Sequence, residues 1–331
     1  MTTVAVLDTT YPDLGIEQGV LDGHGIALHR ENGSSPAAIA ACADAEVIIV
    51  GSRARFDAAA LDSVSARAIV RAGIGVETID LDAATAAGIV VCNVPDYGTE
   101  TVAQHALALA LAGTRRLIEA DRMVRRGEWG FQSTRPMHLP SSSTAGVLGL
   151  GRIGRRVAEL FAAVGFGAVI GHDPFIDQAP EGVQSVDLDD LLERSDVLSI
   201  HIPGNTDGSP AIGARELERM KAGSVLVNTA RGTLIDNAAL ACALRAGRPR
   251  IAALDVFTVE PPDLAEFADT TDRLILSPHQ AWYTEESQTD LRRKSAEEAL
   301  RIITGRRPLN PVGPVVGNGG RPEPDPRSEQ P

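Results

Sequence analysis

Three glycines that follow a short apolar run have the types and spacing of a nucleotide site. The apolar run at residues 145–148 leads into Gly149, Gly151 and Gly154, which stand at G-x-G-x-x-G spacing. The first glycine permits a tight turn, the second lets the backbone approach a pyrophosphate, and the third lets a helix pack on a strand. The N-terminus of the following helix would offer free N–H groups to the phosphates.

The residues after the glycines complete this pattern. Apolar side chains recur at i, i+3, i+4 and i+7 from Val157, which predicts an amphipathic helix. A second apolar run at residues 168–170 ends close to Asp173. An acid about 20 residues after the glycines can accept hydrogen bonds from an adenosine ribose. Because a carboxylate there would repel a 2′-phosphate, the pattern predicts dinucleotide binding and favours NAD over NADP.

Four side chains with acid, base or anion-binding chemistry follow predicted strands further along the chain. They are Arg231, Asp255, Glu260 and His279. Ligands of an open α/β sheet bind beyond the carboxyl ends of its strands. We therefore expect these side chains on the face where the nicotinamide end of a dinucleotide would lie.

Three of these side chains suit hydride transfer to a 2-oxo acid. Negative charge grows on the carbonyl oxygen as hydride reaches the carbon, and His279 is the natural proton donor. Glu260 would stabilise the protonated ring, and Arg231 would hold the substrate carboxylate and the carbonyl oxygen with a rigid fork of donors. The alternatives are a surface ion pair for Arg231, a loop acid for Glu260 and a helix start for His279.

The elements that must position these residues alternate between apolar runs and helical patterns, which is typical of α/β folds with parallel sheets. We predict two Rossmann-like domains, with a discontinuous substrate domain (residues 1–99 plus 283–310) and an inserted NAD-binding domain (residues 100–282). A helix over residues 285–304 should return to the first domain. Residues 311–331 are rich in Pro and Gly and are expected to be disordered. The expected strands are residues 4–7, 27–29, 47–50, 68–70 and 90–92 in the first domain, and 145–148, 168–170, 197–200, 225–228, 251–255 and 274–276 in the second.

The segment at residues 100–116 is unusually apolar for a helix. It has little polar surface, so we expect it to be buried between domains or subunits. His105 lies within it and is interpreted as a core histidine with satisfied hydrogen bonds.

Composition limits the classes of function. The chain has 331 residues, 44% of them hydrophobic, and a net charge of −13, which argues against broad nucleic-acid or anionic-membrane binding. No membrane span or signal peptide is expected. The three cysteines match neither a disulfide framework nor a metal site, and we expect buried thiols in a reducing cytoplasm.

Several motifs in order make the family recognisable: RAGIGVETIDLDAATAAGIVVCNVPDYGTETVAQHALAL, GVLGLGRIGR, VLVNTARGTLIDNAAL, AALDVFTVEPP and LSPHQAW. Over residues 4–310 the chain resembles the D-isomer-specific 2-hydroxyacid dehydrogenases. The resemblance implies a homodimer and a catalytic trio at Arg231, Glu260 and His279. It also implies that the main-chain N–H groups of Ile74 and Gly75 bind the substrate carboxylate. Further cofactor contacts implied by it are Arg152, Ile153, Pro203, Thr229, Ala230 and Asp255.

The substrate is less defined. Arg53 and Arg55 follow the third predicted strand and resemble the basic loop of D-3-phosphoglycerate dehydrogenases, where arginines hold the substrate phosphate. They would clamp a phosphate, a phosphonate or a second carboxylate, or else be solvated surface charges. The segment HQAWYTEES, with Trp282 as an expected substrate-site residue, resembles the branch that includes C-terminal-binding-protein corepressors. An NAD-sensing scaffold with little turnover is therefore the alternative to a dehydrogenase.

Overall fold

The computed structural model describes residues 2–205, 207–313, 315–316 and 322–323, which form two compact units. Unit 1 combines Met1–Gly98 with Thr284–Pro331, and unit 2 is Thr99–Tyr283. The two expected crossings between the domains lie one residue away from these, while the division into substrate and cofactor roles stays a prediction. Most of the tail expected to be disordered lies outside the described residues. Within it, β13 (Val315–Val316) pairs antiparallel with β14 (Pro322–Glu323).

Unit 1 is built on a parallel five-stranded sheet in the order β2-β1-β3-β4-β5. All four residues of the third strand are buried, as expected for a parallel sheet covered on both faces. The bounds are β1 (Thr2–Leu7), β2 (Ile26–Glu31), β3 (Val47–Val50), β4 (Ala68–Arg71) and β5 (Val90–Asn93).

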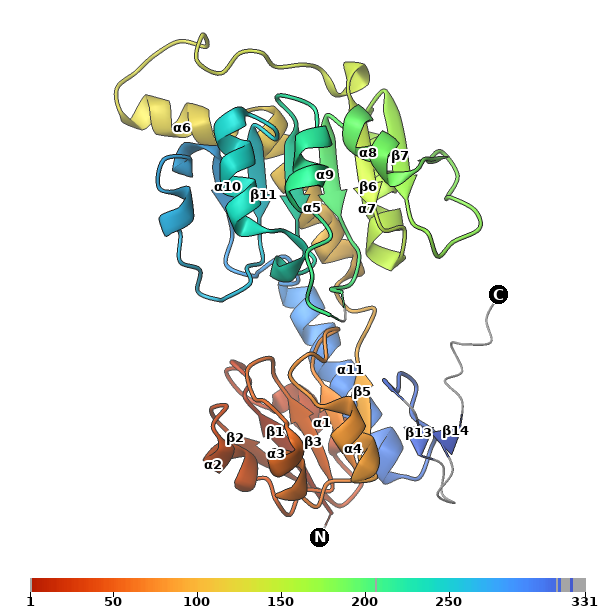
Figure 1. The fold of residues 1–331 in the computed structure, drawn as a ribbon. Coiled ribbons are helices and arrows are strands. Elements are labelled where there is room, and N and C mark those ends of the chain that lie inside the picture. The colour runs from red at the N-terminus through yellow and green to blue at the C-terminus, as the bar shows by residue number, and fades with distance from the viewer. Residues whose placement is uncertain (1, 206, 314, 317–321, 324–331) are drawn as a thin grey trace. The chain divides into compact units, whose positions relative to one another are not determined.

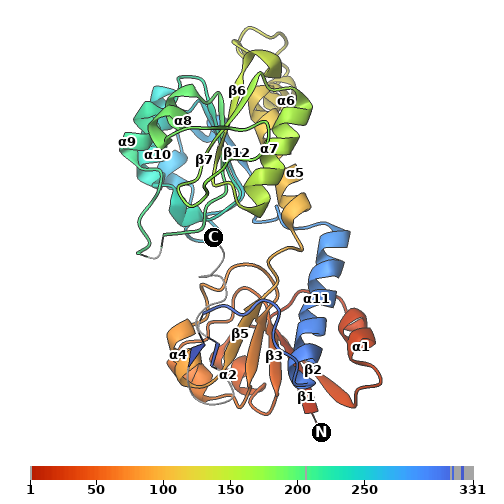
Figure 2. The same cartoon turned by 90° about the vertical axis from the view of Figure 1, so that its right-hand side faces the viewer.

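Five helices belong to this unit among the described residues. On one side of the sheet lies α1 (Gly15–Leu21) beside α11 (Glu285–Ile303), the helix that returns from unit 2 (Figure 2). The opposite side carries α2 (Pro36–Ala40), α3 (Ala58–Asp62) and α4 (Leu81–Ala86). The side chains of Ser35, Asp57 and Asp80 accept hydrogen bonds at the N-termini of these three short helices, which stabilises their first turns.

Unit 2 contains a parallel seven-stranded sheet in the order β12-β11-β10-β9-β6-β7-β8. The strand order reverses between β6 and β9, which is the topological switch point where open α/β sheets bind ligands. The predicted α/β class with two parallel sheets is thus confirmed. The bounds are β6 (Thr144–Leu148), β7 (Ala168–His172), β8 (Gln184–Ser185), β9 (Val197–Ile200), β10 (Val225–Asn228), β11 (Ile251–Leu254) and β12 (Leu274–Leu276).

Helices cover both faces of this sheet (Figures 1 and 2). On one face lie α5 (Thr99–Thr114) and α7 (Arg152–Val164), and on the other lie α8 (Leu188–Arg194), α9 (Ala214–Arg219) and α10 (Asn237–Ala246). Alternate residues of β9 serve the two layers, because strand side chains point to opposite faces. Val197 belongs to the core under α5 and α7, whereas Leu198 and Ile200 belong to the core under α8, α9 and α10. Short 3₁₀ helices are η1 (Pro140–Ser142), η2 (Gly232–Leu234), η3 (Ala265–Phe267) and η4 (Thr271–Arg273).

One expectation about α5 is wrong. Its apolar face is not reserved for another domain or subunit, because Ala103, Ala106 and Ala110 are fully buried inside unit 2 against α7 and the sheet. Small alanine side chains allow the close helix packing seen there. Half of the exposed large apolar side chains of the described residues lie in the next segment, residues 117–139, which we call the arm. It comprises α6 (Leu117–Arg125), which the sequence analysis did not anticipate, and the extended chain that follows (Figure 1).

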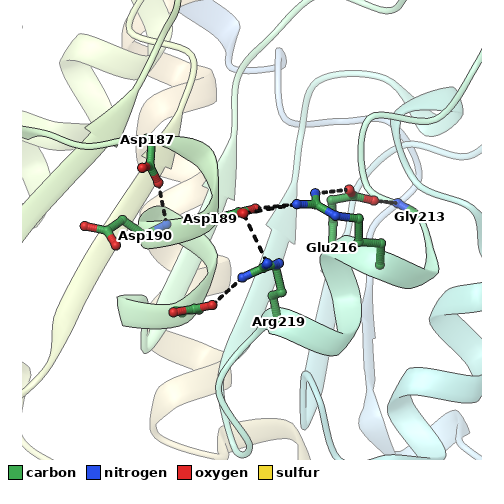
Figure 3. A network of polar contacts seen from close by, with 8 residues as sticks. Asp187, Asp189, Asp190, Gly213, Glu216 and Arg219 are labelled. Atoms are coloured by element: carbon green, nitrogen blue, oxygen red, sulfur yellow. Dashed lines mark hydrogen bonds and ion pairs between the residues drawn. The ribbon is translucent and has the colours of Figure 1, made fainter.

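An ion-pair network joins α8 to α9 on the surface of unit 2 (Figure 3). Asp189 accepts two hydrogen bonds of 3.0 Å from Arg215 and lies 3.2 Å from Arg219. Glu216 adds a capping contact, accepting from the N–H of Gly213 at 3.0 Å. Exposed pairs contribute little one by one, so the network serves mainly to fix how two adjacent helices pack.

No helix among the described residues has the length and apolar character needed to cross a membrane. Nor does the described part of the chain contain a group of three His, Cys, Asp or Glu side chains able to hold a metal. Cys42 and Cys92 are buried, as expected, but Cys242 is exposed, so the expectation of three buried thiols is wrong for that residue.

Candidate active site

The glycine loop after β6 has the geometry that its spacing predicts. Gly149 adopts a φ of 90°, a left-handed conformation that favours glycine. A Cβ at Gly154 would lie 1.9 Å from the main-chain oxygen of Gly149, so only glycine lets α7 approach the loop. A Cβ at Gly151 would have no heavy atom within 4 Å, and no side chain caps α7 there. The loop therefore presents uncapped N–H groups to open space, as phosphate binding needs.

Asp173 lies just beyond β7 and is tied to this loop. One carboxylate oxygen accepts a hydrogen bond of 2.8 Å from the N–H of Leu150, and the other accepts one of 3.0 Å from Phe175. A carboxylate can accept more than one hydrogen bond at each oxygen, so capacity remains for the hydroxyls of a ribose. The structure thus brings Asp173 to the glycine loop, as the sequence pattern requires.

Other predicted cofactor residues lie at the same carboxyl edge of the sheet. Arg152 is exposed and Ile153 half-buried in the first turn of α7, and Pro203 is exposed after β9. After β10, Thr229 is buried, and its hydroxyl has no hydrogen-bond partner among the described residues. Ala230 follows it, its N–H donating to Asn228 Oδ1 at 3.0 Å. Their contacts with a cofactor stay predictions, but an unpartnered buried hydroxyl at this edge fits a polar ligand.

Arg231 precedes η2 and is half-buried. Its Nη1 donates to the main-chain oxygen of Ala230 at 2.8 Å, and its own main-chain oxygen accepts from Asn228 Nδ2 at 2.8 Å. A Cβ at Gly232 would lie 2.0 Å from the carbonyl carbon of Phe257, so glycine lets this turn pack on the segment after β11. The backbone that carries the guanidinium is thereby held in place.

Glu260 and His279 form a direct contact. The Nδ1 of His279 lies 2.7 Å from Glu260 Oε2, and Glu260 Oε1 accepts a hydrogen bond of 3.0 Å from the N–H of Phe257. The side chain of His279 is 49% exposed and that of Glu260 is 38% exposed, so both remain open to a ligand. Because the carboxylate only accepts, Nδ1 carries a hydrogen and Nε2 is the atom left to exchange a proton with a substrate.

A second histidine near this edge is excluded as the proton donor. Burial lowers the pKa of His201, just after β9, to about 3, and its Nε2 lies 2.7 Å from the hydroxyl of Ser199. The ring is therefore neutral at physiological pH.

Asp255 is fully buried at the end of β11. Its carboxylate accepts hydrogen bonds from Ser277 Oγ at 2.5 Å and from the N–H groups of Gln280 and Ala281 at 3.0 and 2.9 Å. Each of these three partners belongs to the loop that carries His279. The predicted contact of Asp255 with the cofactor stays a prediction. Trp282 follows this loop with its ring edge-to-face against Tyr283, 5.6 Å between centroids, and its substrate role is likewise untested.

Arg53 and Arg55, the two arginines expected to bind a second anion, differ in their contacts. Arg53 donates from Nε to Asp8 Oδ1 at 2.8 Å, and Asp8 also accepts from the N–H groups of Arg53 and Ala54. Asp8 is buried, so it uses Arg53 as its counter-ion. Arg55 is exposed, and none of the described residues forms an ion pair or hydrogen bond with its side chain. Asp8 is a residue that the sequence analysis missed; an acid just after a strand was its only signal.

The loop after β4 holds the two residues expected to bind the substrate carboxylate. No described residue accepts a hydrogen bond from the N–H groups of Ile74 or Gly75. The carbonyl oxygen of Ile74 accepts from Asn93 Nδ2 at 2.7 Å, which fixes the loop. Two adjacent unpaired N–H groups are compatible with an anion, and their role in binding substrate stays a prediction.

Comparison with known proteins identifies the family. Residues 107–281 match the model of the D-isomer specific 2-hydroxyacid dehydrogenase, NAD binding domain. The chain belongs to the D-isomer specific 2-hydroxyacid dehydrogenase family. Among its curated relatives, D-3-phosphoglycerate dehydrogenase of Archaeoglobus fulgidus is 39% identical over 78% of this chain and 50% of the relative. Glyoxylate reductase of Aeropyrum pernix is 39% identical over 76% of this chain and 77% of the relative.

The chain spans about half the length of the phosphoglycerate dehydrogenases that it matches. Among solved structures, TP0037 from Treponema pallidum, a D-lactate dehydrogenase, has a TM-score of 0.81 and 27% identity, covering 94% of this chain and 100% of that one. Members with different substrates therefore share this fold, and the fold alone does not select a substrate.

The family's NAD-binding domain falls on unit 2, and the residues present there fit NAD. The open glycine loop with the uncapped start of α7 would hold the pyrophosphate, Asp173 the ribose hydroxyls, and the segment at Thr229 the nicotinamide end. When bound, NADH supplies a hydride. Every residue of this set comes from unit 2.

Replacing Asp173 by alanine should narrow the preference for NAD over NADP. The change removes the negative charge that repels a 2′-phosphate, and we expect the ratio of kcat/KM values for NADH and NADPH to fall by roughly 10-fold or more, the size of a charge-assisted hydrogen bond. Steady-state rates with each cofactor measure the ratio. Asp177→Ala, an acid a few residues further along, serves as the control. An unchanged ratio in Asp173→Ala would remove this residue from the ribose site.

Proposed function

We propose that this chain is an NAD-dependent dehydrogenase that interconverts a small anionic 2-oxo acid and its D-2-hydroxy acid. The observation that carries the proposal is the 2.7 Å contact between His279 Nδ1 and Glu260, in the same unit as the NAD-binding loop. This contact leaves Nε2 as the proton-exchanging atom. Family membership and the intact trio of Arg231, Glu260 and His279 support it.

The roles of the side chains follow from their chemistry. In reduction, the carbonyl carbon of the 2-oxo acid accepts a hydride, and the electron pair of the C=O bond moves onto oxygen. His279 Nε2 donates its proton to that oxygen and becomes neutral, while Glu260 keeps the hydrogen on Nδ1 and orients the ring. Arg231 can bind the substrate carboxylate and stabilise the oxygen as its charge grows. In oxidation, neutral His279 takes the hydroxyl proton back.

We propose further that the substrate carries a second anionic group, such as a phosphate. Relatives named as D-3-phosphoglycerate dehydrogenases support this, as does the exposed Arg55 at the carboxyl end of β3. The structure changes the expectation for Arg53, because Arg53 already neutralises the buried Asp8. Arg55 is therefore the residue to test first as the phosphate ligand.

A matched substrate pair tests this. Hydroxypyruvate and its 3-phosphate ester differ only in the second anion, and NADH loss at 340 nm reports turnover of each. Arg55→Ala should lower kcat/KM for the phosphorylated acid by roughly 10- to 100-fold, the range for a charged hydrogen bond, and leave the plain acid nearly unchanged. Arg53→Ala should instead lower the melting temperature. Equal losses on both acids in Arg55→Ala would contradict a phosphate contact. No turnover of any acid, with NADH still bound, would favour the scaffold function.

We also propose a homodimer formed through the arm. Half of the exposed large apolar side chains of the described residues lie in these 23 residues, and Trp129 is 91% and Phe131 62% exposed. Monomeric proteins rarely leave such a cluster in water. A cytoplasmic location is proposed as well, in keeping with the free thiols of Cys42 and Cys92.

Light scattering on a sizing column tests the dimer. The wild type should have twice the mass of one chain at micromolar concentration, and Trp129→Ser with Phe131→Ser should convert it to a monomer, because both rings would lose their apolar contacts. Phe175→Ser, on another exposed ring outside the arm, should leave the mass unchanged. A monomeric wild type would contradict the proposal.

A further inference from the structure

His105, which the sequence analysis interpreted as a core histidine, contacts the loop that carries His279. It projects from α5, and its Nε2 lies 3.0 Å from Ser277 Oγ and 3.6 Å from Asp255 Oδ1. Ser277 begins the loop Ser277–Ala281, and α5 is separated from it by 172 positions in the chain. Although α5 is mostly apolar, His105 thus contacts Ser277 and Asp255, two polar residues at the base of the loop that carries His279.

The direction of these hydrogen bonds follows from how many hydrogens are present. The buried Asp255 carboxylate accepts from two main-chain N–H groups and from Ser277 Oγ at 2.5 Å. The single hydroxyl hydrogen of Ser277 is therefore used on Asp255. Ser277 Oγ can only accept from His105, so His105 carries its hydrogen on Nε2 and donates it. The chain of hydrogen bonds runs from His105 through Ser277 to Asp255.

The same Asp255 determines the backbone of His279. Its main-chain oxygen accepts the N–H of His279 at 2.8 Å, while its carboxylate holds Gln280 and Ala281 on the other side. His279 has a φ of 51°, a left-handed conformation that is uncommon for residues other than glycine. Such a conformation persists only where surrounding contacts hold it. Asp255 supplies those contacts, and Ser277 and His105 hold Asp255.

We propose that His105 is a positioning residue for His279. It donates to Ser277, which orients the hydroxyl toward Asp255, and Asp255 holds the loop in the left-handed turn that directs the ring of His279 at Glu260. The proposal rests on the proposed function in one respect: it takes His279 as the proton donor. An apolar residue in place of His105 would leave Ser277 Oγ without this donor. The loop would then be more mobile, and the ring of His279 would spend less time in the position needed for proton transfer.

Three variants test this in the full-length protein. His105→Leu removes the donor, Ser277→Ala breaks the chain at its middle, and His105→Gln places an amide N–H where Nε2 stood. His105→Leu and Ser277→Ala should lower kcat by roughly 10- to 100-fold, the cost of displacing a catalytic group by about 1 Å. Their dissociation constant for NADH, measured by fluorescence, should be unchanged. His105→Gln should restore most of kcat. A wild-type kcat in His105→Leu would overturn the proposal. So would a kcat of His105→Gln no higher than that of His105→Leu.

A second readout does not need turnover. With ¹³C-labelled histidine, the ring signal of His279 can be assigned among the seven histidines by its loss in His279→Asn. The signal should shift in His105→Leu and in Ser277→Ala and should return in His105→Gln. A His279 signal that is identical in wild type and His105→Leu would overturn the positioning role even if no substrate were found. Absence of turnover in the wild type with the expected shifts would overturn only the proposed function.

Discussion

His279→Ala should lower kcat by roughly 10²- to 10⁴-fold, the contribution of a general acid, while leaving NADH binding intact. The ring lies outside the glycine loop and Asp173, which we expect to hold the cofactor, and its contact is with Glu260 at 2.7 Å. Without the imidazole the proposed proton donor is gone, and His201, a second histidine near this edge, is neutral and does not replace it. Steady-state rates at 340 nm and a fluorescence titration with NADH separate the two effects.

Glu260→Gln is the matched control for this prediction. The amide oxygen can still accept from Nδ1, so the ring keeps its orientation, but the negative charge that stabilises the protonated ring is gone. We expect a loss of kcat between those of the wild type and His279→Ala. If Glu260→Gln were as inactive as His279→Ala, charge would be the dominant contribution of Glu260. If His279→Ala retained wild-type kcat, the assignment of the proton donor would be wrong.

The second large effect concerns stability. Arg292 of α11 and Glu17 of α1 form an ion pair at 2.6 Å, and their side chains are only 5% and 1% exposed. Arg292 also lies over the ring of Tyr11, 4.6 Å from its centroid. Removing one partner of a buried pair leaves an uncompensated charge, so Arg292→Met and Glu17→Met should each cost about 3–5 kcal/mol of unfolding free energy. Urea denaturation followed by circular dichroism measures this loss.

Two further variants make the test specific. Arg293→Met, at the next position of α11, breaks exposed pairs with Asp290 and Glu297 and should cost less than about 1 kcal/mol. The double variant Arg292→Met with Glu17→Met leaves no buried unpaired charge, since Asp13, the other partner of Arg292, is exposed, and it should recover most of the stability. Additive losses in the double variant would mean that the two side chains act independently, contrary to the ion pair. This pair matters for the fold because it joins the returning helix to the N-terminal half of unit 1.

The geometry of the glycine loop and Asp173, where we expect the cofactor, could be predicted from the sequence because its signals are local. Gly149, Gly151, Gly154 and Asp173 belong to one strand–helix–strand segment, in which the turn, the phosphate site and the helix packing involve near neighbours. The position of His279 was predictable for a related reason. A residue just after a strand must lie at the carboxyl edge of a parallel sheet, whatever the order of the strands.

Which side chains meet at the carboxyl edge of each sheet was decided by the tertiary structure. Arg53 and Arg55 look equivalent in the sequence, but β1 lies next to β3, so Asp8 after one strand meets Arg53 after the other, 45 positions away. His105 looked like a core residue, yet α5 crosses the sheet near β11 and brings it to Ser277. Apolar periodicity predicted most of the strands and helices, and glycine spacing predicted the glycine loop, because each depends on neighbours in the chain. The partner of a buried charge depends on strand order and helix crossing, which periodicity within a segment does not encode.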